Sequence, residues 1–306
     1  MAVLDCGIDR SLFDPQEHYV TGISYCHPAF GNKESQYWLA TDPHGSHICN
    51  IISQIDPCCS FYIAKVAENK HDPKADRVIK AIDWAIDQRV DIINLSLVLF
   101  KEDDEVWDAV KRAANNNIVI ICSTADQGLV TQEVWPAMYS IRPENSIIPI
   151  AATSANGRLM EYSSETFAHY TLQGENVTPL PTPSPDAKIV QRQVSGSSVA
   201  TAMATGVASL VLACHRIANA IPGCSTKMSK SPNQTVIKEM FKHKLCIRTS
   251  TDDSPKHWPI KPEKVFPTKE DAPKEYDWGE PQEVQRWIQN VYMKSKSTND
   301  LVMINN

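Results

Sequence analysis

The first residue along the chain whose side chain could act in catalysis is an aspartate at the end of a short apolar run. Residues 3–9 read VLDCGID, so Asp5 follows two apolar residues and precedes Gly7. Open α/β sheets carry their functional groups at the carboxyl ends of the strands, which is where Asp5 is expected. Taken alone, the segment is also typical of a plain turn at a strand end, because Asp and Gly are common turn residues.

The second segment places a histidine at the start of a predicted apolar helix. Residues 44–52 read HGSHICNII. The pKa of an imidazole lies near neutrality, so His44 suits a general base. His44 and His47 are three residues apart and could share one helix face as metal ligands. The segment lacks the Glu of the H-E-x-x-H motif and any obvious third ligand, which disfavours a metal site. A structural pair of histidines is the remaining alternative.

The third segment is a helix of small residues that begins with serines. From Ser195 to Ser209, twelve of fifteen residues are Gly, Ala, Ser or Thr. So little side-chain volume indicates a helix packed closely through the centre of a domain. A Ser in its first turn lies at the positive end of the helix dipole, among free backbone N–H groups, which favours an oxyanion. An ordinary Ser N-cap fits the same residues.

The elements that must position these residues alternate along the first two thirds of the chain. Two amphipathic helices are predicted at 74–89 and 103–116, and an apolar helix at 198–220. Short β-branched runs predict buried strands at 3–4, 61–66, 92–97, 118–121 and 147–151. This alternation predicts an α/β fold of three layers, a doubly wound and mostly parallel sheet with helices on both faces.

The composition changes after Pro222. Residues 223–280 are rich in Lys, Pro, Ser, Thr and Asp, with one amphipathic stretch at 235–245, and a Trp-bearing helix is predicted at 281–294. We therefore expect a domain at residues 1–222, followed by an irregular, partly helical C-terminal extension and tail at 223–306.

Length, charge and cysteine content narrow the class of protein. The chain has 306 residues and a formal net charge of −6. A chain with this charge lacks the excess of basic residues that binds nucleic acid or an anionic membrane. No apolar run approaches the roughly 20 residues that span a bilayer. The nine cysteines are odd in number and show no CxxC spacing, and the first residues do not resemble a signal peptide. These features predict a cytoplasmic protein with free thiols.

The order Asp, His, Ser along the chain is that of the subtilisin catalytic triad. From residue 1 to about residue 220 the sequence resembles the subtilisin-like (peptidase S8) serine peptidases. The stretch DIINLSL at 91–97 is similar to the substrate-binding strand of that family, and residues 118–128 resemble its oxyanion-hole strand and loop. WPA at 135–137 and AAT at 151–153 resemble the segments that follow. The serine motif SGSSVATA at 195–202 is most similar to intracellular fungal-type subtilase domains.

The resemblance implies a role for each of the three residues. Ser198 is expected to be the nucleophile, His44 the general base and then acid, and Asp5 the residue that orients His44. Ser197 is a rival nucleophile by composition, but the register of the motif (Gly, hydroxyl, Ser, apolar, Ala) selects Ser198.

Binding groups follow from the same resemblance. The backbone of residues 96–98 is expected to pair with an extended substrate as an added strand, and Ala125 is expected to lie on the floor of the substrate pocket. The expected substrate-binding residues are Ser96, Leu97, Val98 and Ala125. The expected oxyanion hole consists of Asp126 and Ser198.

Asp126 departs from the family pattern in the most consequential way. The family normally has Asn there, whose amide donates to the developing oxyanion, and loss of such a donor costs a factor of about 10²–10³ in rate. An ionised carboxylate would repel the intermediate, whereas a protonated one could donate a hydrogen bond. We therefore hypothesise that Asp126 is neutral in the active form, which predicts an acid-shifted pH optimum.

Other departures concern the pocket and the catalytic Asp. Val98, Leu99 and Phe100 replace a Gly-rich wall, and Ala125 replaces a Gly; the chain has only 11 glycines in all. Added side chains narrow a pocket, so small or flat residues are expected at P1, the substrate residue before the scissile bond. Cys6 replaces the Ser or Thr beside the catalytic Asp, which exchanges a good hydrogen-bond donor for a weak one.

These observations predict a serine endopeptidase of restricted specificity that acts through an acyl-enzyme. The alternative is a subtilase-fold interaction or regulatory module with weak or no proteolytic activity, since Asp126, Cys6 and a filled pocket would all impair catalysis. A lipase or esterase is disfavoured because the G-x-S-x-G elbow is absent. We expect no cofactor and no metal. The expected partners are a protein or peptide substrate and other domains of a longer polypeptide, without nucleic acid or membrane.

Overall fold

The fold was analysed in a computed structural model of the 306-residue chain. It describes residues 1–13, 18–26, 35–126, 133–142, 147–161, 169–179, 193–220, 231–245, 258–266, 274–276 and 280–293. One sheet of eight strands organises these residues, in the order β2-β3-β1-β4-β5-β6-β7-β8, with every neighbouring pair parallel. The predicted α/β fold with a parallel sheet is confirmed.

The strands are short. They are β1 (Ala2–Asp5), β2 (Val20–Ser24), β3 (Phe61–Lys65), β4 (Ile92–Leu95), β5 (Val119–Ser123), β6 (Ile147–Thr153), β7 (Tyr170–Gln173) and β8 (Trp258–Pro259). The helices are α1 (His44–Ile55), α2 (Ala75–Asp87), α3 (Asp104–Asn115), α4 (Ser197–Ala220), α5 (Asn233–Met240) and α6 (Pro281–Met293). Short 3₁₀ or π turns lie at η1 (Arg10–Leu12), η2 (Ala137–Ile141), η3 (Phe241–Leu245) and η4 (Pro262–Lys264).

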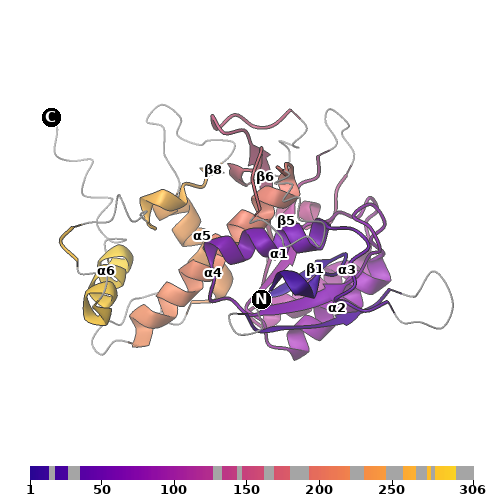
Figure 1. Ribbon diagram of the computed structural model, residues 1–306, viewed down its shortest axis with the longest axis horizontal. Coiled ribbons are helices and arrows are strands. Elements are labelled where there is room, and N and C mark those ends of the chain that lie inside the picture. Colours follow the sequence, from indigo (N-terminus) through magenta and orange to yellow (C-terminus); the bar gives the residue numbers. More distant parts are fainter. Residues whose placement is uncertain are drawn as a thin grey trace.

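The sheet separates two hydrophobic cores, because alternate strand residues point to opposite faces. Val3 packs in the core that contains α1 and α4, and Leu4 packs in the core that contains α2 and α3. In Figure 1, α2 and α3 lie together on one side of the molecule, and α1 and α4 run side by side across its middle. The three predicted layers are therefore present.

Strand β1 lies at the topological switch point of the sheet, where the order of the strands reverses. It pairs with β3 on one side and with β4 on the other. Crevices at the carboxyl ends of strands form at such switch points in open α/β sheets. Asp5 ends β1, and the segments that follow β4 and β5 begin at the same edge.

Helix α4 crosses the interior with small residues on its surface. A Cβ added at Gly206 would lie 2.8 Å from Cβ of Ile55, so glycine permits the close approach of α1. Among the described residues, α4 is the one helix long and apolar enough to cross a membrane. It packs against the sheet and three other helices, α1, α5 and α6, as a core helix does.

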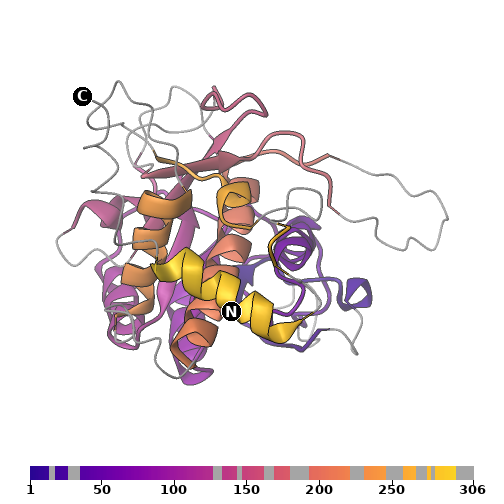
Figure 2. The same cartoon turned by 90° about the vertical axis from the view of Figure 1, so that its left-hand side faces the viewer.

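Residues beyond 222 pack in the same core as those before it. Phe241 is fully buried and contacts Tyr170 edge-on, with ring centroids 5.4 Å apart. Strand β8 extends the sheet beside β7, and α6 lies against α4 (Figure 2). The described part of the C-terminal segment therefore covers the α4 face of the sheet. The domain boundary at residue 222 stays a prediction.

Candidate active site

Asp5 and His44 form a paired acid and imidazole. Asp5 is fully buried at the end of β1, and His44 is the first residue of α1. Nδ1 of His44 lies 2.9 Å from Oδ1 and 3.0 Å from Oδ2 of Asp5. A carboxylate at Nδ1 fixes the tautomer in which Nε2 is free to accept a proton. The structure therefore brings together two of the residues expected from the sequence.

Opposing effects set the pKa of His44. Burial lowers this pKa, but the charge and the hydrogen bond of Asp5, with a contribution from Asp42, outweigh burial and raise it above the usual 6.5. Lys70 acts in the opposite direction, because a nearby positive charge disfavours the imidazolium.

His47 does not pair with His44 as a metal ligand would. Burial, and then the charge of His44, lower the pKa of His47, which favours the neutral ring. Within the described part of the chain, no group of three or more His, Cys, Asp and Glu side chains could hold a metal ion. The expectation that the protein needs no metal stays a prediction.

Asp42 is a supporting residue that sequence reasoning missed. Its Oδ1 accepts the backbone N–H of His44 at 2.9 Å, and its Oδ2 accepts the N–H of Lys70 at 3.1 Å. Burial raises the pKa of Asp42, but these two hydrogen bonds outweigh burial and lower it. An Asp side chain commonly accepts the backbone N–H two residues ahead in an Asx turn, so the bond to His44 could have been found. The bond to Lys70 could not have been found from the sequence, because it joins two separate loops.

Gly45 allows α1 to lie against the end of β1. A Cβ at this position would come 2.2 Å from the carbonyl oxygen of Gly7 and 3.1 Å from Oδ1 of Asp5. The first of these distances is far inside van der Waals contact with backbone, so any side chain would move α1. The short distance between Asp5 and His44 therefore depends on this glycine.

Ser198 and Ser197 stand in different environments at the start of α4. Ser197 is buried, and its N–H donates to Oδ1 and Oδ2 of Asp126 at 2.8 and 2.9 Å. Ser198 is half-buried and lines the same two cavities as His44. Its carbonyl oxygen accepts a hydrogen bond from Ser96 Oγ at 3.2 Å. The two environments favour Ser198 over Ser197 as the reactive hydroxyl.

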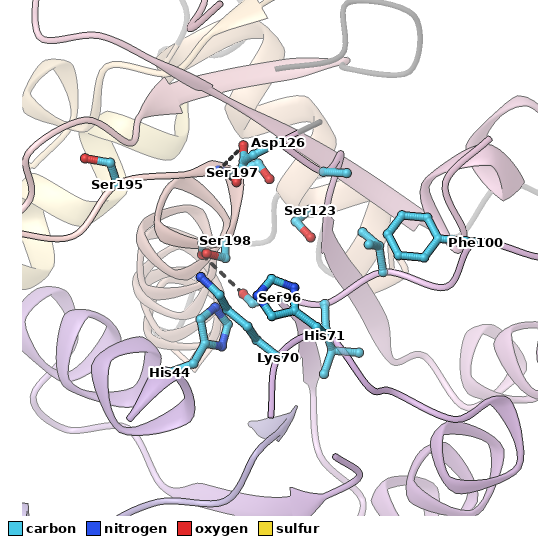
Figure 3. A pocket seen from close by; sticks show the side chains of 13 residues that line it. His44, Lys70, His71, Ser96, Phe100, Ser123, Asp126, Ser195, Ser197 and Ser198 are labelled. Carbon is cyan, nitrogen blue, oxygen red and sulfur yellow. Dashed lines mark hydrogen bonds between the residues drawn. The ribbon is translucent and has the colours of Figure 1, made fainter. Parts of the chain in front are cut away.

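His44 and Ser198 face a shared space without being joined. Figure 3 shows them at one end of a cavity of about 230 Å³, and no hydrogen bond connects their side chains in this structure. Hydrogen bonds between catalytic groups are often long in unliganded sites and shorten when substrate binds. The arrangement thus supplies a base within reach of a hydroxyl at a helix N-terminus.

Asp126 lies where the sequence places an oxyanion group. It follows β5, and its Oδ2 would contact a Cβ at Gly196 at 2.5 Å, beside Ser198. Asp126 is an exposed residue that lines the cavity, and its carboxyl is partly covered where it accepts the N–H of Ser197. Burial raises the pKa of Asp126, and the hydrogen bonds from Ser197 only partly oppose that rise. Residues 127 and 128 of the expected oxyanion loop lie outside the described residues.

The expected substrate-binding residues meet at one cavity of about 230 Å³ (Figure 3). Ser96, Leu97, Val98 and Ala125 all line it, together with Phe100. Leu99 differs from the expectation, because its backbone pairs with Trp135 in an antiparallel bridge and its side chain is buried in the α2 and α3 core. Leu99 therefore does not narrow this cavity.

Ala125 and Cys6 both stand in unusual settings. Ala125 has φ of +68°, in the left-handed region that costs a residue with a Cβ about 1–2 kcal/mol. The backbone N–H of Cys6 donates to Oδ1 of Asp5 at 2.7 Å. Burial, and then the charge of Asp5, raise the pKa of the Cys6 thiol, so it stays protonated and remains a donor to Asp5.

Lys70 and His71 are further lining residues that the sequence did not indicate. Both lie in the loop after β3, and both line the cavity of about 230 Å³. No residue spacing in the loop after β3 indicates that it lines the site. The loop lies there only because of the position of β3 in the sheet.

A sequence model of the subtilase family (peptidase S8) matches residues 1–245 of the chain. The chain belongs to the subtilase family. The expected resemblance is confirmed, and the match extends beyond residue 222.

Relatives of this subtilase include bacterial and fungal proteins. It is 28% identical over 180 residues to the major intracellular serine protease of Bacillus subtilis, a match that covers 54% of each chain. It is 31% identical over 190 residues to the subtilisin-like protease het-Q2 of Podospora anserina, covering 56% of this chain and 48% of that one. The subtilase thus spans about half the length of these relatives.

Solved structures support the fold of the subtilase. The protease domain of PatA superposes with a TM-score of 0.62 at 18% identity, covering 86% of this chain and 92% of that one. The prenylagaramide maturation protease PagA gives a TM-score of 0.60 at 20% identity, covering 83% and 85%.

The contact at Gly45 yields a prediction about the pKa of His44. In Gly45→Ala the added methyl pushes α1 away from Gly7, which lengthens the bond between His44 and Asp5. Because Asp5 raises the pKa of His44, we expect that pKa to fall in the variant, as measured by an NMR titration of the imidazole.

Gly157→Ala is the control for a glycine replacement outside the site, because a Cβ there would have nothing within 4 Å and Gly157 lines neither cavity beside Ser198; its φ of +81° makes the change locally strained without a contact to α1. An unchanged pKa of His44 in Gly45→Ala would contradict the prediction.

Proposed function

We propose that this subtilase is a serine endopeptidase in which Ser198, His44 and Asp5 form the catalytic triad. The observation that carries the proposal is the hydrogen-bonded pair of Asp5 and His44, whose imidazole lines one cavity together with Ser198 at the N-terminus of α4. Relatives named as serine proteases support the same activity.

The reaction begins with attack of Ser198 Oγ on the carbonyl carbon of the scissile bond. His44 Nε2 takes the hydroxyl proton, and Asp5 stabilises the imidazolium. His44 then gives this proton to the leaving amine as the C–N bond breaks, which leaves an acyl ester on Ser198. Water attacks that ester with His44 again as base, and the carboxylic acid and the free serine are released.

Substrate binds as an added strand on the segment after β4. The N–H of Leu99 donates to the carbonyl oxygen of Trp135 at 2.7 Å, and the N–H of Trp135 donates to the carbonyl oxygen of Leu99 at 2.9 Å. Since successive residues of an extended chain direct these groups to opposite edges, those of Val98 face the other way, toward the cavity. This alternation supports main-chain pairing of Val98 with a peptide.

The compartment is proposed to be cytoplasmic. Seven of the nine cysteines lie in the described residues, and all seven are free thiols, as in a reducing environment. One relative is named an intracellular protease of Bacillus subtilis and another an intracellular protease of Paenibacillus polymyxa, although a further one is named extracellular.

A fluorophosphonate probe tests the catalytic assignment. The probe reacts with a serine that has both a competent base and an oxyanion site, so we expect one label per chain in the pH range 5 to 8. Labelling should vanish in Ser198→Ala and persist in Ser197→Ala, as read by intact mass.

A wild-type protein that fails to label at every pH would favour the alternative function, an interaction or regulatory module of subtilase fold. One observation supports that alternative. The carboxylate of Asp126 accepts a backbone N–H at the start of α4, where an amide would donate to an oxyanion.

The pH dependence follows from two groups with raised pKa values. Activity requires neutral His44, whose pKa is lowered by burial and Lys70 but raised more by Asp5 and Asp42, so kcat/KM falls at acid pH. Activity also requires protonated Asp126, whose pKa is raised by burial and lowered by Ser197, Lys70 and His44. The rate therefore falls again at higher pH, and the profile is a bell.

Asp126→Asn removes the second requirement. We expect the alkaline limb to disappear and kcat/KM at pH 8 to rise by about 10²-fold, since an amide restores the donor. The acid limb, which belongs to His44, should remain. If both rate and pH profile stayed the same, Asp126 would not act as an oxyanion donor.

The size of the P1 residue is proposed to be limited by Ala125 and Phe100, which line the cavity. A peptide library should show preference for small or flat P1 residues. In Ala125→Gly the profile should broaden toward Phe and Tyr, without a large loss of stability, because glycine also relieves the left-handed backbone. Wild-type preference for Phe, Tyr or Leu would contradict the prediction.

A further inference from the structure

Lys70 stands between two cavities that meet at Ser198. The cavity of about 230 Å³, with Val98 and Ala125, and a second one of about 300 Å³, with His47 and Val199, both include Lys70, His44 and Ser198 in their lining. Figure 3 shows the side chain of Lys70 beside His44, extended toward Ser198. A peptide that crosses from one cavity to the other must therefore pass this ammonium group.

The backbone of Lys70 is fixed while its side chain is exposed. Oδ2 of Asp42 accepts the N–H of Lys70 at 3.1 Å, and the same carboxylate accepts the N–H of His44. This arrangement holds the backbone of Lys70 beside that of His44. The ammonium of Lys70 therefore stays near the site, even when its exposed side chain changes rotamer.

The carboxylates near Lys70 are already bound to backbone groups. Asp42 accepts the two N–H groups described above, and Asp126 accepts the N–H of Ser197 with both of its oxygens. Among the described residues, no ion pair within 4 Å includes Lys70. His71 adds a second basic side chain to the cavity of about 230 Å³. The side of the cleft formed by the loop after β3 thus presents positive charge to a ligand.

We infer that Lys70 selects substrates with an acidic side chain on a residue that adjoins the scissile bond. This inference rests on the proposed peptidase function and names its substrate class. A carboxylate placed near Lys70 gains a favourable charge interaction without displacing any bond of the free protein. It also offsets the effect of Lys70 on His44, because a neutralised ammonium no longer disfavours the imidazolium that forms during attack.

The test compares peptides with Asp or Glu against the same peptides with Asn or Gln, at each residue flanking the cleaved bond. We expect kcat/KM to be about tenfold higher for an acidic residue at one of these positions, which corresponds to about 1.4 kcal/mol. The preference should shrink in 0.5 M salt, because exposed charges are screened. Lys70→Glu should reverse it in favour of Lys.

Two further variants separate charge from structure. Lys74→Glu makes the same charge change at an exposed lysine outside both cavities, so it should keep the acidic preference. Lys70→Met should abolish the preference and move the acid limb of the pH profile to higher pH, since Lys70 lowers the pKa of His44.

The outcomes distinguish this inference from the proposed function. If Ser198 reacts with the fluorophosphonate probe in wild type and in Lys70→Glu, but both cleave acidic and neutral peptides alike, Lys70 does not select substrate and the peptidase assignment stands. If acidic preference persists in Lys70→Glu, another group is responsible and the inference is overturned. If wild-type Ser198 does not react at all, both proposals fail together.

Discussion

The site depends on one helix that passes through the core with almost no side-chain volume. Small residues let α4 approach α1 and the sheet closely, and this proximity delivers its first turn to the edge where β1, β4 and β5 end. The buried face of α4 also carries polar groups that need partners. Asn94 Nδ2 donates to Thr205 Oγ1 at 2.9 Å, and Ser96 Oγ bonds to both Asn94 Oδ1 and the carbonyl of Ser198. Since a buried polar group without a partner costs about 1–3 kcal/mol, this chain fixes the rotation of α4, and with it the direction of Ser198.

A second set of contacts places the imidazole against that serine. Lys65 is fully buried at the end of β3, and its ammonium is bound by Glu68 at 2.8 Å and by the carbonyl of Leu39 at 3.1 Å. These bonds tie the loop after β3 to the segment that leads into α1, and Asp42 repeats the connection two residues before His44. Helix α1 is thus held at its N-terminus by a buried charge and at its flank by the contact that Gly45 permits. The two halves of the site lie on different helices, α1 and α4, which pack directly against each other.

The sequence predicted what depends on local pattern. The helix expected at 74–89 is α2 (Ala75–Asp87), because its apolar periodicity is strong. Strand β2 (VTGIS) has no apolar run and is half-exposed throughout, so only its pairing with β3 makes it a strand. The same division holds in the site. Asp5, His44 and Ser198 follow from residue type and motif, whereas Lys70 enters the cleft through the position of β3 in the sheet, which no spacing along the chain encodes.

The charges in the cleft have opposite effects on its two titrating groups. In the proposed mechanism His44 loses its proton and Asp126 keeps one, and a protonated His44 lowers the pKa of Asp126. Lys70 favours ionised Asp126 and neutral His44. In that mechanism Lys70 therefore assists the base and opposes the oxyanion donor. A carboxylate bound at Lys70 would weaken both effects, so an acidic substrate would favour the proton on Asp126 as it enters. The proposed substrate charge is then part of the proposed active arrangement.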